Sequence, residues 1–457
     1  MRRPAVAALT GSVLALALPE PAVVAGHGSA APNILIFMTD DQRADMMGVM
    51  KKTQRWFVRQ GTSYPFAYAT TPLCCPSRAS IFSGRYAHNT GVETNAEATR
   101  LDQRSTMQRY LQDAGYRTAI VGKYLNDWQG APPFFHDWAI FLAQDAGYTG
   151  AGFNVNGAST RVKRYSTNFI GTRAVQLLRS YEQNDQDPWL LTVAPLAPHA
   201  PYQPEKRYRK TGVSKFRKNP AVGEDDRTDK PAWVQGKNNG LNKNRKIWTV
   251  QQRMLLSADN MIDRVMRELN ALGEGQNTLA FFLSDNGFTL GEHGLRQKHS
   301  PYTASVQLPF MVRWPGHLAG GAVDPRVVGN IDIAPTVYDA AGITPDPEFP
   351  VDGRSILAPD VRDHMLLEYE HRQDRAVPTW ASLRTPTYQY VEYYDETLQA
   401  VTFREYYDLV ADPWQLTNLL ADGDPNNDPP DDLLTRLSVE LQGDTRCEGT
   451  EGPTGCP

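Results

Sequence analysis

The stretch NILIFMTDD, residues Asn33–Asp41, joins an almost continuous apolar run to two adjacent carboxylates. Apolar runs of five or six residues predict strands that are buried on both faces, as in the centre of a parallel sheet. Three more runs of this kind occur at 118–122, 189–193 and 278–283. Polar residues of catalytic type follow the four runs in chain order: Asp40 and Asp41, Lys123, His199, and Asp285 with Asn286.

Helices are predicted between these strands, at 106–114, 169–181 and 250–272, from apolar residues at helical spacing and glycine stop signals. Strands that alternate with helices predict an α/β sheet. Ligands bind such sheets at the carboxyl ends of the strands. We therefore expect the six polar side chains to surround one pocket.

The first thirty residues have the order of a secretory signal peptide: Arg2 and Arg3, an apolar run over 4–18, and then small residues. The run is shorter than the roughly 20 residues that span a bilayer, and no later stretch is long and apolar enough to do so. We expect residues 1–30 to direct secretion and the protein to be extracytoplasmic, without a membrane span. The paired arginines leave general and twin-arginine export open.

Composition and pattern divide the rest of the chain into two parts. The 457 residues are 41% apolar and 21% charged, as in globular proteins, and a formal charge of −4 does not suggest nucleic-acid binding. We expect a catalytic domain over 31–345 and a smaller α+β domain over 360–457. Within the smaller domain, runs rich in Tyr, Thr and Val at 381–409 predict an antiparallel sheet, and 431–442 predicts a closing helix.

The region 205–247 interrupts the alternating pattern, because it is rich in Lys, Arg, Asn and Gly and lacks apolar periodicity. We expect it to be a basic insertion loop, either solvated or forming a wall of the active-site mouth. Its cations would attract a polyanionic substrate in the second case and would only be solvated in the first. They include Lys206, Arg207, Arg209, Lys210, Lys215, Arg217 and Lys218.

The four cysteines form two pairs along the sequence. Cys447 and Cys456 enclose a short loop near the C-terminus and predict a disulfide in an oxidising compartment. Cys74 and Cys75 are neighbours, and neighbouring cysteines rarely bond to each other because the geometry is strained. That pair needs another explanation.

Cys74 opens the most informative segment, LCCPSRASIFSGR at 73–85. Pro76 suits the first turn of a helix, so Cys74 is expected just before a helix N-terminus, where free N–H groups favour anions. Arg78, one turn later, can fold back toward the same place. A phosphatase with a cysteine thiolate needs a Cys-x5-Arg loop, and the chain has Ser80 and Ile81 at those positions, which excludes that class.

The Cys-x-Pro-Ser-Arg pattern that begins at Cys74, followed by Ser-Gly-Arg at 83–85, resembles the signature of the type I sulfatases. The resemblance extends over nearly the whole chain, including the Asp-Asp pair after the first strand and Ser-Asp-Asn-Gly at 284–287. It implies the alkaline-phosphatase-like fold: a large mixed, mainly parallel sheet sandwiched by helices, with a smaller C-terminal antiparallel-sheet domain. It also implies that a formylglycine-generating enzyme converts Cys74 to formylglycine during biosynthesis.

The same resemblance implies roles for the site residues. Asp40, Asp41, Asp285 and Asn286 would hold one hard cation, calcium or alternatively magnesium, together with the hydrated aldehyde at residue 74. One hydroxyl of that aldehyde would attack sulfur, and the other would later expel sulfate, which a serine with a single oxygen could not do. The remaining implied roles are orientation of the nucleophile by Arg78, sulfate binding by Lys123 and Lys298, and protonation or orientation of the leaving alcohol by His199.

Two departures bear on the substrate. Many sulfatases carry a histidine where this chain has Leu125, and the local sequence GKYLN at 122–126 resembles the N-acetylglucosamine-6-sulfatase branch instead. Asn126 would then supply a hydrogen bond to substrate. Thr303 stands where that branch usually has glutamate. Three nearby histidines are expected to be structural or to lie behind the reacting groups: His88, His293 and His299.

The sequence thus predicts a sulfuric-ester hydrolase acting on sulfated amino sugars, glycosaminoglycan fragments or aryl sulfates, as small molecules or oligosaccharides. One alternative is a phosphomonoesterase or phosphodiesterase of the same superfamily, which usually has two zinc ions and a Thr or Ser nucleophile. Another is a catalytically silent protein that binds sulfated glycans, which would follow if Cys74 stayed a thiol. The natural substrate, exo or endo action and the oligomeric state stay open.

Overall fold

The computed structural model describes residues 31–184, 187–238, 240–371 and 376–457. The predicted signal peptide, 1–30, lies outside the described residues. The main feature is a ten-stranded sheet with the order β13-β2-β12-β9-β1-β8-β4-β5-β6-β7. A second, four-stranded sheet has the order β15-β16-β17-β18. Both sheets belong to one compact unit, residues 31–457.

The four strands predicted from apolar runs are neighbours at the centre of the large sheet. They are β1 (Asn33–Thr39), β4 (Arg117–Gly122), β8 (Trp189–Ala194) and β9 (Thr278–Ser284), and β1 pairs in parallel with β8 and β9 while β4 pairs in parallel with β8. Every residue of β1, β8 and β9 is buried. This confirms the predicted parallel core.

The outer strands make the sheet mixed, as the predicted fold class requires. β5 (Asp137–Phe141) is parallel to β4, whereas β6 (Ala151–Val155) is antiparallel to β5 and β12 (Phe310–Arg313) is antiparallel to β9. The remaining short strands are β2 (Thr62–Ser63), β3 (Ala67–Tyr68), β7 (Ala158–Val162), β10 (Thr289–Leu290), β11 (Arg296–Gln297), β13 (Ala322–Val323) and β14 (Val328–Gly329).

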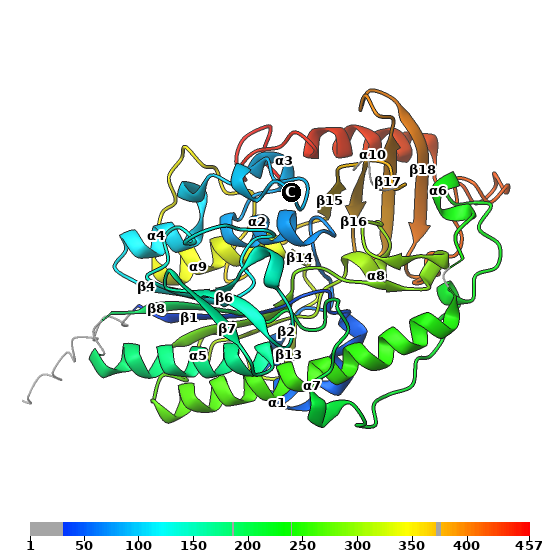
Figure 1. The fold of residues 1–457 in the computed structure, drawn as a ribbon. Coiled ribbons are helices and arrows are strands. Elements are labelled where there is room, and N and C mark those ends of the chain that lie inside the picture. Colours follow the sequence, from blue (N-terminus) through cyan, green and yellow to red (C-terminus); the bar gives the residue numbers. More distant parts are fainter. Residues whose placement is uncertain (1–30, 185–186, 239, 372–375) are drawn as a thin grey trace, which may run out of the picture. The chain divides into compact units, whose positions relative to one another are not determined.

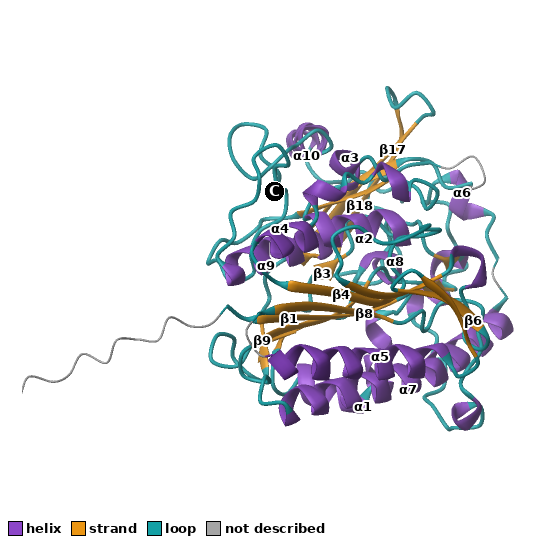
Figure 2. Cartoon of the chain, turned by 60° about the vertical axis from the view of Figure 1, so that its left-hand side comes forward, coloured by secondary structure: helices purple, strands orange, loops and turns teal. Residues whose placement is uncertain are grey.

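Helices cover both faces of the large sheet (Figure 2). Side chains of a strand alternate between faces, and in β1 Leu35 and Phe37 pack into one apolar core while Ile34 and Ile36 pack into the other. The first core lies under α1 (Lys51–Phe57), α5 (Ser166–Tyr181) and α7 (Leu241–Ala271). The second lies under α2 (Cys74–Ser83), α4 (Met107–Asp113) and α9 (Ile333–Ala341).

Helix α7 begins at Leu241, nine residues before the predicted start at 250. The predicted insertion loop therefore ends before 247, and that boundary is wrong. In the first turns of α7, the buried position is occupied by Asn244 and not by an apolar residue. The side-chain oxygen of Asn244 accepts a hydrogen bond from Arg296. Apolar periodicity therefore starts only at Ile247, which is why the sequence pattern missed these turns. The rest of the loop contains only η6 (Lys206–Tyr208), η7 (Pro220–Val222) and α6 (Ala232–Gln235) among its described residues.

The second sheet is antiparallel, as predicted, and α10 (Asp431–Asp444) lies across it (Figure 1). Its strands are β15 (Met365–Tyr369), β16 (Trp380–Arg384), β17 (Tyr388–Tyr394) and β18 (Val401–Asp408). β15 lies outside the stretch at 381–409 from which this sheet was predicted. The division into domains at 31–345 and 360–457 stays a prediction.

The predicted disulfide between Cys447 and Cys456 is confirmed, and Cys74 and Cys75 are free and buried. The backbone oxygen of Cys447 accepts hydrogen bonds from His88 and Asn89 of α3 (Ala87–Thr90), so the disulfide loop holds the helix that follows α2. In the described part of the chain, no helix is long and apolar enough to cross a membrane. A further short helix, α8 (Thr303–Val306), follows β11.

The pair between His88 and Glu368 predicts a pH-dependent stability. Burial opposes the positive charge of His88, but Glu368 at 2.8 Å outweighs it and raises the pKa to about 9. A histidine whose pKa is higher in the folded state contributes stability below its unfolded pKa of about 6.5, and this contribution is lost as pH rises through 9. We expect His88→Gln to lower the free energy of unfolding at pH 6. The difference in free energy of unfolding between wild type and variant, which we call the gap, should become about 3 kcal/mol smaller between pH 6 and 10.

Urea unfolding at the two pH values measures this gap. His317→Gln is the matched control, because His317 is exposed. A gap for His88→Gln that stays constant across the range would contradict the assignment.

Candidate active site

The carboxyl ends of the central strands bring the predicted polar residues together. The ammonium of Lys123, directly after β4, lies 2.7 Å from a carboxylate oxygen of Asp40, directly after β1. The backbone N–H of Asp41 donates to Asp285, directly after β9, at 3.1 Å. The imidazole of His199, in the loop after β8, lies 3.7 Å from Asp41. One cluster thus collects side chains from four strands.

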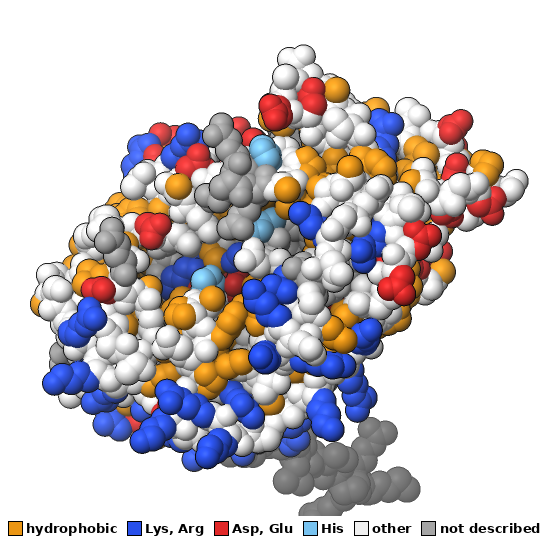
Figure 3. Space-filling view, turned by 45° about the vertical axis from the view of Figure 1, so that its right-hand side comes forward, with side chains coloured by type: hydrophobic (Ala, Val, Ile, Leu, Met, Phe, Trp, Pro, Cys, Tyr) orange, Lys and Arg blue, Asp and Glu red, His pale blue; other side chains and the backbone are white. Residues whose placement is uncertain are grey.

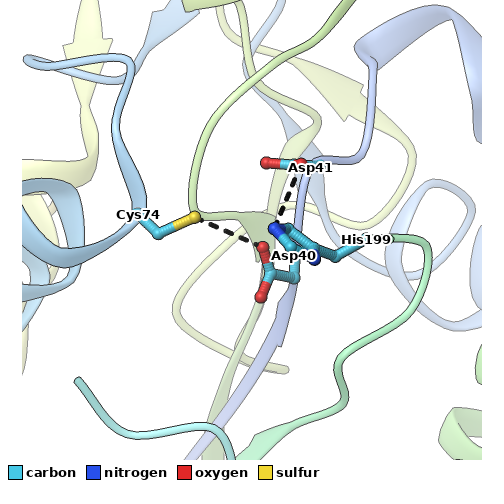
Figure 4. Close-up of side chains that lie close together, drawn as sticks. All are labelled: Asp40, Asp41, Cys74 and His199. Atoms are coloured by element: carbon cyan, nitrogen blue, oxygen red, sulfur yellow. Dashed lines mark hydrogen bonds and ion pairs between the residues drawn. The ribbon is translucent and has the colours of Figure 1, made fainter. Parts of the chain in front are cut away.

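Cys74 faces this cluster from the N-terminus of α2, with its sulfur 3.5 Å from an oxygen of Asp40 (Figure 4). It is the first residue of α2 and is preceded by Leu73 in an extended conformation, so the helix starts one residue earlier than Pro76 alone suggested. The N–H of Cys75 donates to the side chain of Asn95 at 2.9 Å. Asn95 was not predicted, because it lies in a turn about twenty residues away and no local pattern marks it.

Arg78 folds back into the cluster from the same helix, as expected, and its side chain is fully buried. Its Nε donates to Asp285 at 2.9 Å, one Nη donates to the backbone oxygen of Lys123 at 2.8 Å, and the other lies 3.6 Å from Asp40. Burial opposes its charge, and the neighbouring carboxylates of Asp285 and Asp40 outweigh this and raise its pKa. Arg78 therefore stays charged and ties three strand ends to α2.

Lys298, which follows β11, completes the group of fixed cations. Its ammonium lies 2.5 Å from a carboxylate oxygen of Asp41, 2.7 Å from the sulfur of Cys74 and 3.4 Å from the side-chain oxygen of Asn286. Burial disfavours its charge, but Asp41 and the other anionic groups hold its pKa well above the ordinary value. The position between Asp41, Asn286 and Cys74 is therefore one that attracts a cation.

The carboxylates and cations hold each other ionised. Burial favours the neutral form of Asp40, yet Lys123 and the cations around it lower its pKa far below the ordinary value. The pKa of Asp41 is lowered in the same way, against burial, chiefly by Lys298 and His199. Asp40, Asp41 and the cations around them thus form a fixed array of alternating charges at neutral pH.

His199 lies at the outer side of the cluster, with 32% of its side chain exposed. Burial opposes its charge, but Asp40 and Asp41 raise its pKa to about 9. Its Nδ1 lies 2.5 Å from the backbone oxygen of Ala200, and its Nε2 points toward Asp41. A protonated imidazole in this place is able to donate a proton to a group that enters from solvent.

The donor atoms of the cluster fit a divalent cation. Ligand atoms of Asp40, Asp41, Cys74 and His199 all lie within 4.8 Å of one another (Figure 4). Asn286 joins them through a 2.7 Å hydrogen bond from its amide to Asp41. Carboxylate and amide oxygens are the ligands that calcium and magnesium prefer. The buried negative charge around Asp41, balanced here by the ammonium of Lys298, supplies the electrostatic attraction that such an ion needs.

Asn126 and the three histidines have different surroundings. The side-chain oxygen of Asn126 is buried and has no hydrogen-bond partner among the described residues, so it is available to a ligand. His88 is held by Glu368, His293 by Glu224 at 2.9 Å, and the ring of His299 lies 5.5 Å from that of Tyr369. These histidines contact groups outside the carboxylate cluster.

A cavity of about 550 Å³ lies between α3 and the four-stranded sheet. Its wall includes Thr71, three residues before Cys74, and Trp380, whose indole N–H donates to the backbone oxygen of His299 beside Lys298. The cavity is therefore built on the two segments that carry Cys74 and Lys298. Three carboxylates and three aromatic side chains line it: Glu93, Glu368, Glu370, Tyr369, Trp380 and Tyr394.

Comparison with known proteins places this arrangement in a family. The model of the family described as "Sulfatase" matches residues 32–343, and a model described as "N-sulphoglucosamine sulphohydrolase, C-terminal" matches 291–441. The chain is 34% identical over 349 residues to the extracellular sulfatase SULF-1 homolog of Drosophila melanogaster, which covers 71% of this chain but only 31% of that protein. It is 28% identical to the N-acetylglucosamine-6-sulfatase of Homo sapiens, covering 92% of this chain and 86% of the human one.

Among solved structures, the fold is similar to one in complex with its substrate D-glucosamine-2-N,6-O-disulfate. The TM-score is 0.80, the sequence identity is 22%, and the match covers 90% of this chain and 97% of the other. The stretch matched by the sulfatase model, 32–343, spans most of the 457 residues and contains every member of the charged cluster described above. The chain belongs to the sulfatase family.

Proposed function

We propose that this chain hydrolyses sulfate monoesters, with the side chain of Cys74, converted to formylglycine, as the nucleophile. One observation carries the proposal: the sulfur of Cys74 lies beside Asp40 and Lys298 in a buried, charge-balanced cluster that fits a divalent cation. The sulfur occupies the place of the hydroxyl oxygens that the hydrated aldehyde would carry. A formylglycine-generating enzyme is the partner that this conversion requires.

The fixed cations bind and orient the sulfate group. Lys123 reaches the cluster from the end of β4 and Lys298 from the segment after β11, and both ammonium groups already contact carboxylates, so no large rearrangement is needed to present their charge to sulfate oxygens. Charge moves toward the leaving oxygen as the S–O bond breaks, and preorganised donors stabilise that change. Arg78 fixes the positions of Asp40 and Asp285 and, through α2, that of residue 74.

The modification explains why a cysteine stands at this position. A hydrated aldehyde offers two hydroxyls on one carbon, of which one can attack sulfur and the other can afterwards drive release of sulfate. A cysteine thiol or a serine hydroxyl offers only one reacting atom. The N-terminus of α2 and Lys298 stabilise the negative charge on an oxygen atom bound to this carbon.

His199 is the proton donor to the leaving alcohol in this proposal. Its Nε2 lies 3.7 Å from Asp41, and its partial exposure puts the imidazole on the side from which substrate enters. Donation by a positioned imidazole typically accelerates such steps by about 10²–10⁴-fold.

Asp40, Asp41, Asp285 and Asn286, together with residue 74, would hold the cation, which we propose to be calcium or alternatively magnesium. When bound, a divalent ion supplies Lewis-acid stabilisation of negative charge on oxygen. The all-oxygen donor set of three carboxylates and one amide favours a hard cation over zinc.

Sulfated amino sugars are the substrate class that we propose, with glycosaminoglycan fragments and aryl sulfates as wider possibilities. The human relative is named as an N-acetylglucosamine-6-sulfatase, and the similar solved structure holds a glucosamine disulfate. The cavity between α3 and the four-stranded sheet, with Thr71 in its wall, combines aromatic and carboxylate side chains, which suit the apolar faces and hydroxyls of a sugar. We further propose that the protein acts outside the cell, in line with its disulfide and with the extracellular relative.

The test compares nitrophenyl sulfate with nitrophenyl phosphate, each with calcium or zinc added to metal-free protein. We expect sulfate ester turnover with calcium to exceed phosphate ester turnover with either metal by a factor of about 10³ or more, since the site has a single-cation donor set. Phosphate turnover that is faster and zinc-dependent would establish the superfamily alternative. A screen of 6-, 2- and N-sulfated glucosamine for sulfate release then assigns the position that is cleaved.

Asn126 provides a prediction on substrate binding. Its buried side-chain oxygen has no hydrogen-bond partner in the described part of the chain, so we expect Asn126→Ala to raise KM for a sulfated glucosamine about tenfold with little change in kcat, which is the worth of one hydrogen bond. Steady-state kinetics measure both constants, with Asn426→Ala on an exposed loop as the control. An unchanged KM would remove Asn126 from the substrate site.

A further inference from the structure

Residues 206–218 form a strap along α7. Starting from the C-terminal half of the helix, Tyr208 is hydrogen-bonded to Asn260. The backbone oxygen of Thr211 accepts from Arg253 at 3.0 Å, and that of Ser214 accepts from Trp248 at 2.9 Å. The strap therefore runs antiparallel to the helix, and its contacts with α7 are made by uncharged groups of the strap.

The strap is the most basic segment of the described chain. Seven of the thirteen residues in 206–218 are Lys or Arg, and none is Asp or Glu. All seven cations are exposed, and within the described residues only Arg207 forms an ion pair, with the preceding Glu205. Exposed cations of α7 extend the surface, which we call the basic ridge: Arg245, Lys246 and Arg264.

Like charges are held together at one end of the ridge. Arg207 and Arg264 both donate to Asn168, at 3.2 Å and 3.0 Å. Partial burial, together with the neighbouring charges of Arg164 and Arg207, lowers the pKa of Arg264. An anion placed among the three guanidinium groups would relieve this repulsion.

A short connecting segment joins the ridge to the loop that carries His199. Lys206 comes seven residues after His199, and the phenol of Tyr165 fixes the connecting segment by donating to the backbone oxygen of Gln203. From Arg245 to Arg264 the ridge is about 28 Å long at 1.5 Å per helical residue. Figure 3 shows Lys and Arg along the lower part of the face, with few acidic side chains among them.

We propose that the basic ridge binds the continuing chain of a linear sulfated polysaccharide whose sulfate ester occupies the active site; this rests on the proposed function. A sulfated polysaccharide repeats anionic groups along its length, which matches a row of exposed cations of which, in the described part of the strap, only Arg207 has an ion-pair partner. A membrane is a poorer match, because none of the exposed large hydrophobic side chains lies on the ridge. Single-stranded nucleic acid would need free aromatic rings, and the ring of Phe216 packs on Trp248 instead.

The experiment uses the whole protein and a triple variant, Lys210→Ser, Lys215→Ser and Lys218→Ser. The control is Arg100→Ser, Arg104→Ser and Arg436→Ser, which removes the same charge from exposed sites off the ridge. We expect the ridge variant to bind heparin about tenfold more weakly than wild type, with a shallower dependence on salt because fewer counterions are released. We expect the control to bind like wild type. Equal heparin binding by all three proteins would overturn the proposal.

A second set of measurements compares the enzymatic activity of the same proteins and their binding to other anionic ligands. On nitrophenyl sulfate the ridge variant keeps the wild-type kcat/KM, whereas on a long sulfated glycan its kcat/KM falls about tenfold, since steering by the ridge is lost. Absence of turnover in every protein would remove the proposed function, and heparin binding would still decide whether the ridge binds a sulfated chain. Tighter binding of phosphatidylserine vesicles or duplex DNA than of heparin at equal salt would also overturn the proposal.

Discussion

Cys74→Ala is expected to lower kcat for nitrophenyl sulfate by a factor of about 10⁵, the scale found when an enzyme loses its nucleophile. Alanine has no reactive atom to place beside Asp40, while Lys123 and Lys298 still bind the sulfate group. We therefore expect KM to change much less than kcat. Initial rates and the binding of inorganic sulfate, measured on the same preparations, separate the two effects.

Cys75→Ala is the matched control for this variant. Its side chain packs into the apolar core under α2, and burial raises its thiol pKa to about 12, so it is no nucleophile. We expect Cys75→Ala to lose some stability and keep wild-type kcat. Near-normal kcat for a folded Cys74→Ala protein would show that another group attacks sulfur.

Asp285→Asn is expected to remove the bound metal and to lower kcat/KM by about 10²–10³-fold. Asp285 accepts from the N–H of Asp41 and from Arg78, so the change removes a carboxylate from the cation site and deprives the buried guanidinium of its nearest carboxylate. Metal content by mass spectrometry and kcat/KM on nitrophenyl sulfate should fall together.

Asp332→Asn controls for the loss of a buried carboxylate. Asp332 is held by Arg362 at 2.7 Å outside the cluster, so breaking this pair costs about 3–5 kcal/mol of stability and leaves the metal in place. If Asp285→Asn protein bound as much metal as wild type, Asp285 would not be a ligand.

The central strands and the meeting of their polar ends could be predicted because both depend on local patterns. A strand that is buried on both faces, such as Asn33–Thr39, is almost continuously apolar, so its sequence is easy to identify. The polar residues that follow such parallel strands lie at the same edge of the sheet, where the strands end. The outer strands were not predicted, because β6 and β7 are short and their sequences lack such runs, and β7 is largely exposed.

Contacts between distant segments account for the other differences. Asn244 in α7 accepts a hydrogen bond from Arg296, and Asn95, in a turn, accepts one from the N–H of Cys75 in α2. The residues of each pair are far apart in the sequence, so no local pattern predicts these contacts. The cavity between α3 and the four-stranded sheet forms only where β15 and β16 meet the segments at 71 and 299. Charge density along 206–218 was visible in the sequence, whereas its course along α7 was not.

The claim that formylglycine at residue 74 is the nucleophile is tested most directly by measuring sulfate release together with the fraction of Cys74 that has been converted. Trypsin cleavage after Arg59 and Arg78 yields peptide 60–78, which contains Cys74 and Cys75. Conversion replaces the CH₂SH of residue 74 with CHO, so the peptide becomes lighter and takes up one alkyl group where the unconverted peptide takes up two. We predict that the rate of sulfate release from nitrophenyl sulfate is proportional to the converted fraction and vanishes with it. Full turnover by protein whose peptide carries two alkylated cysteines would contradict the account.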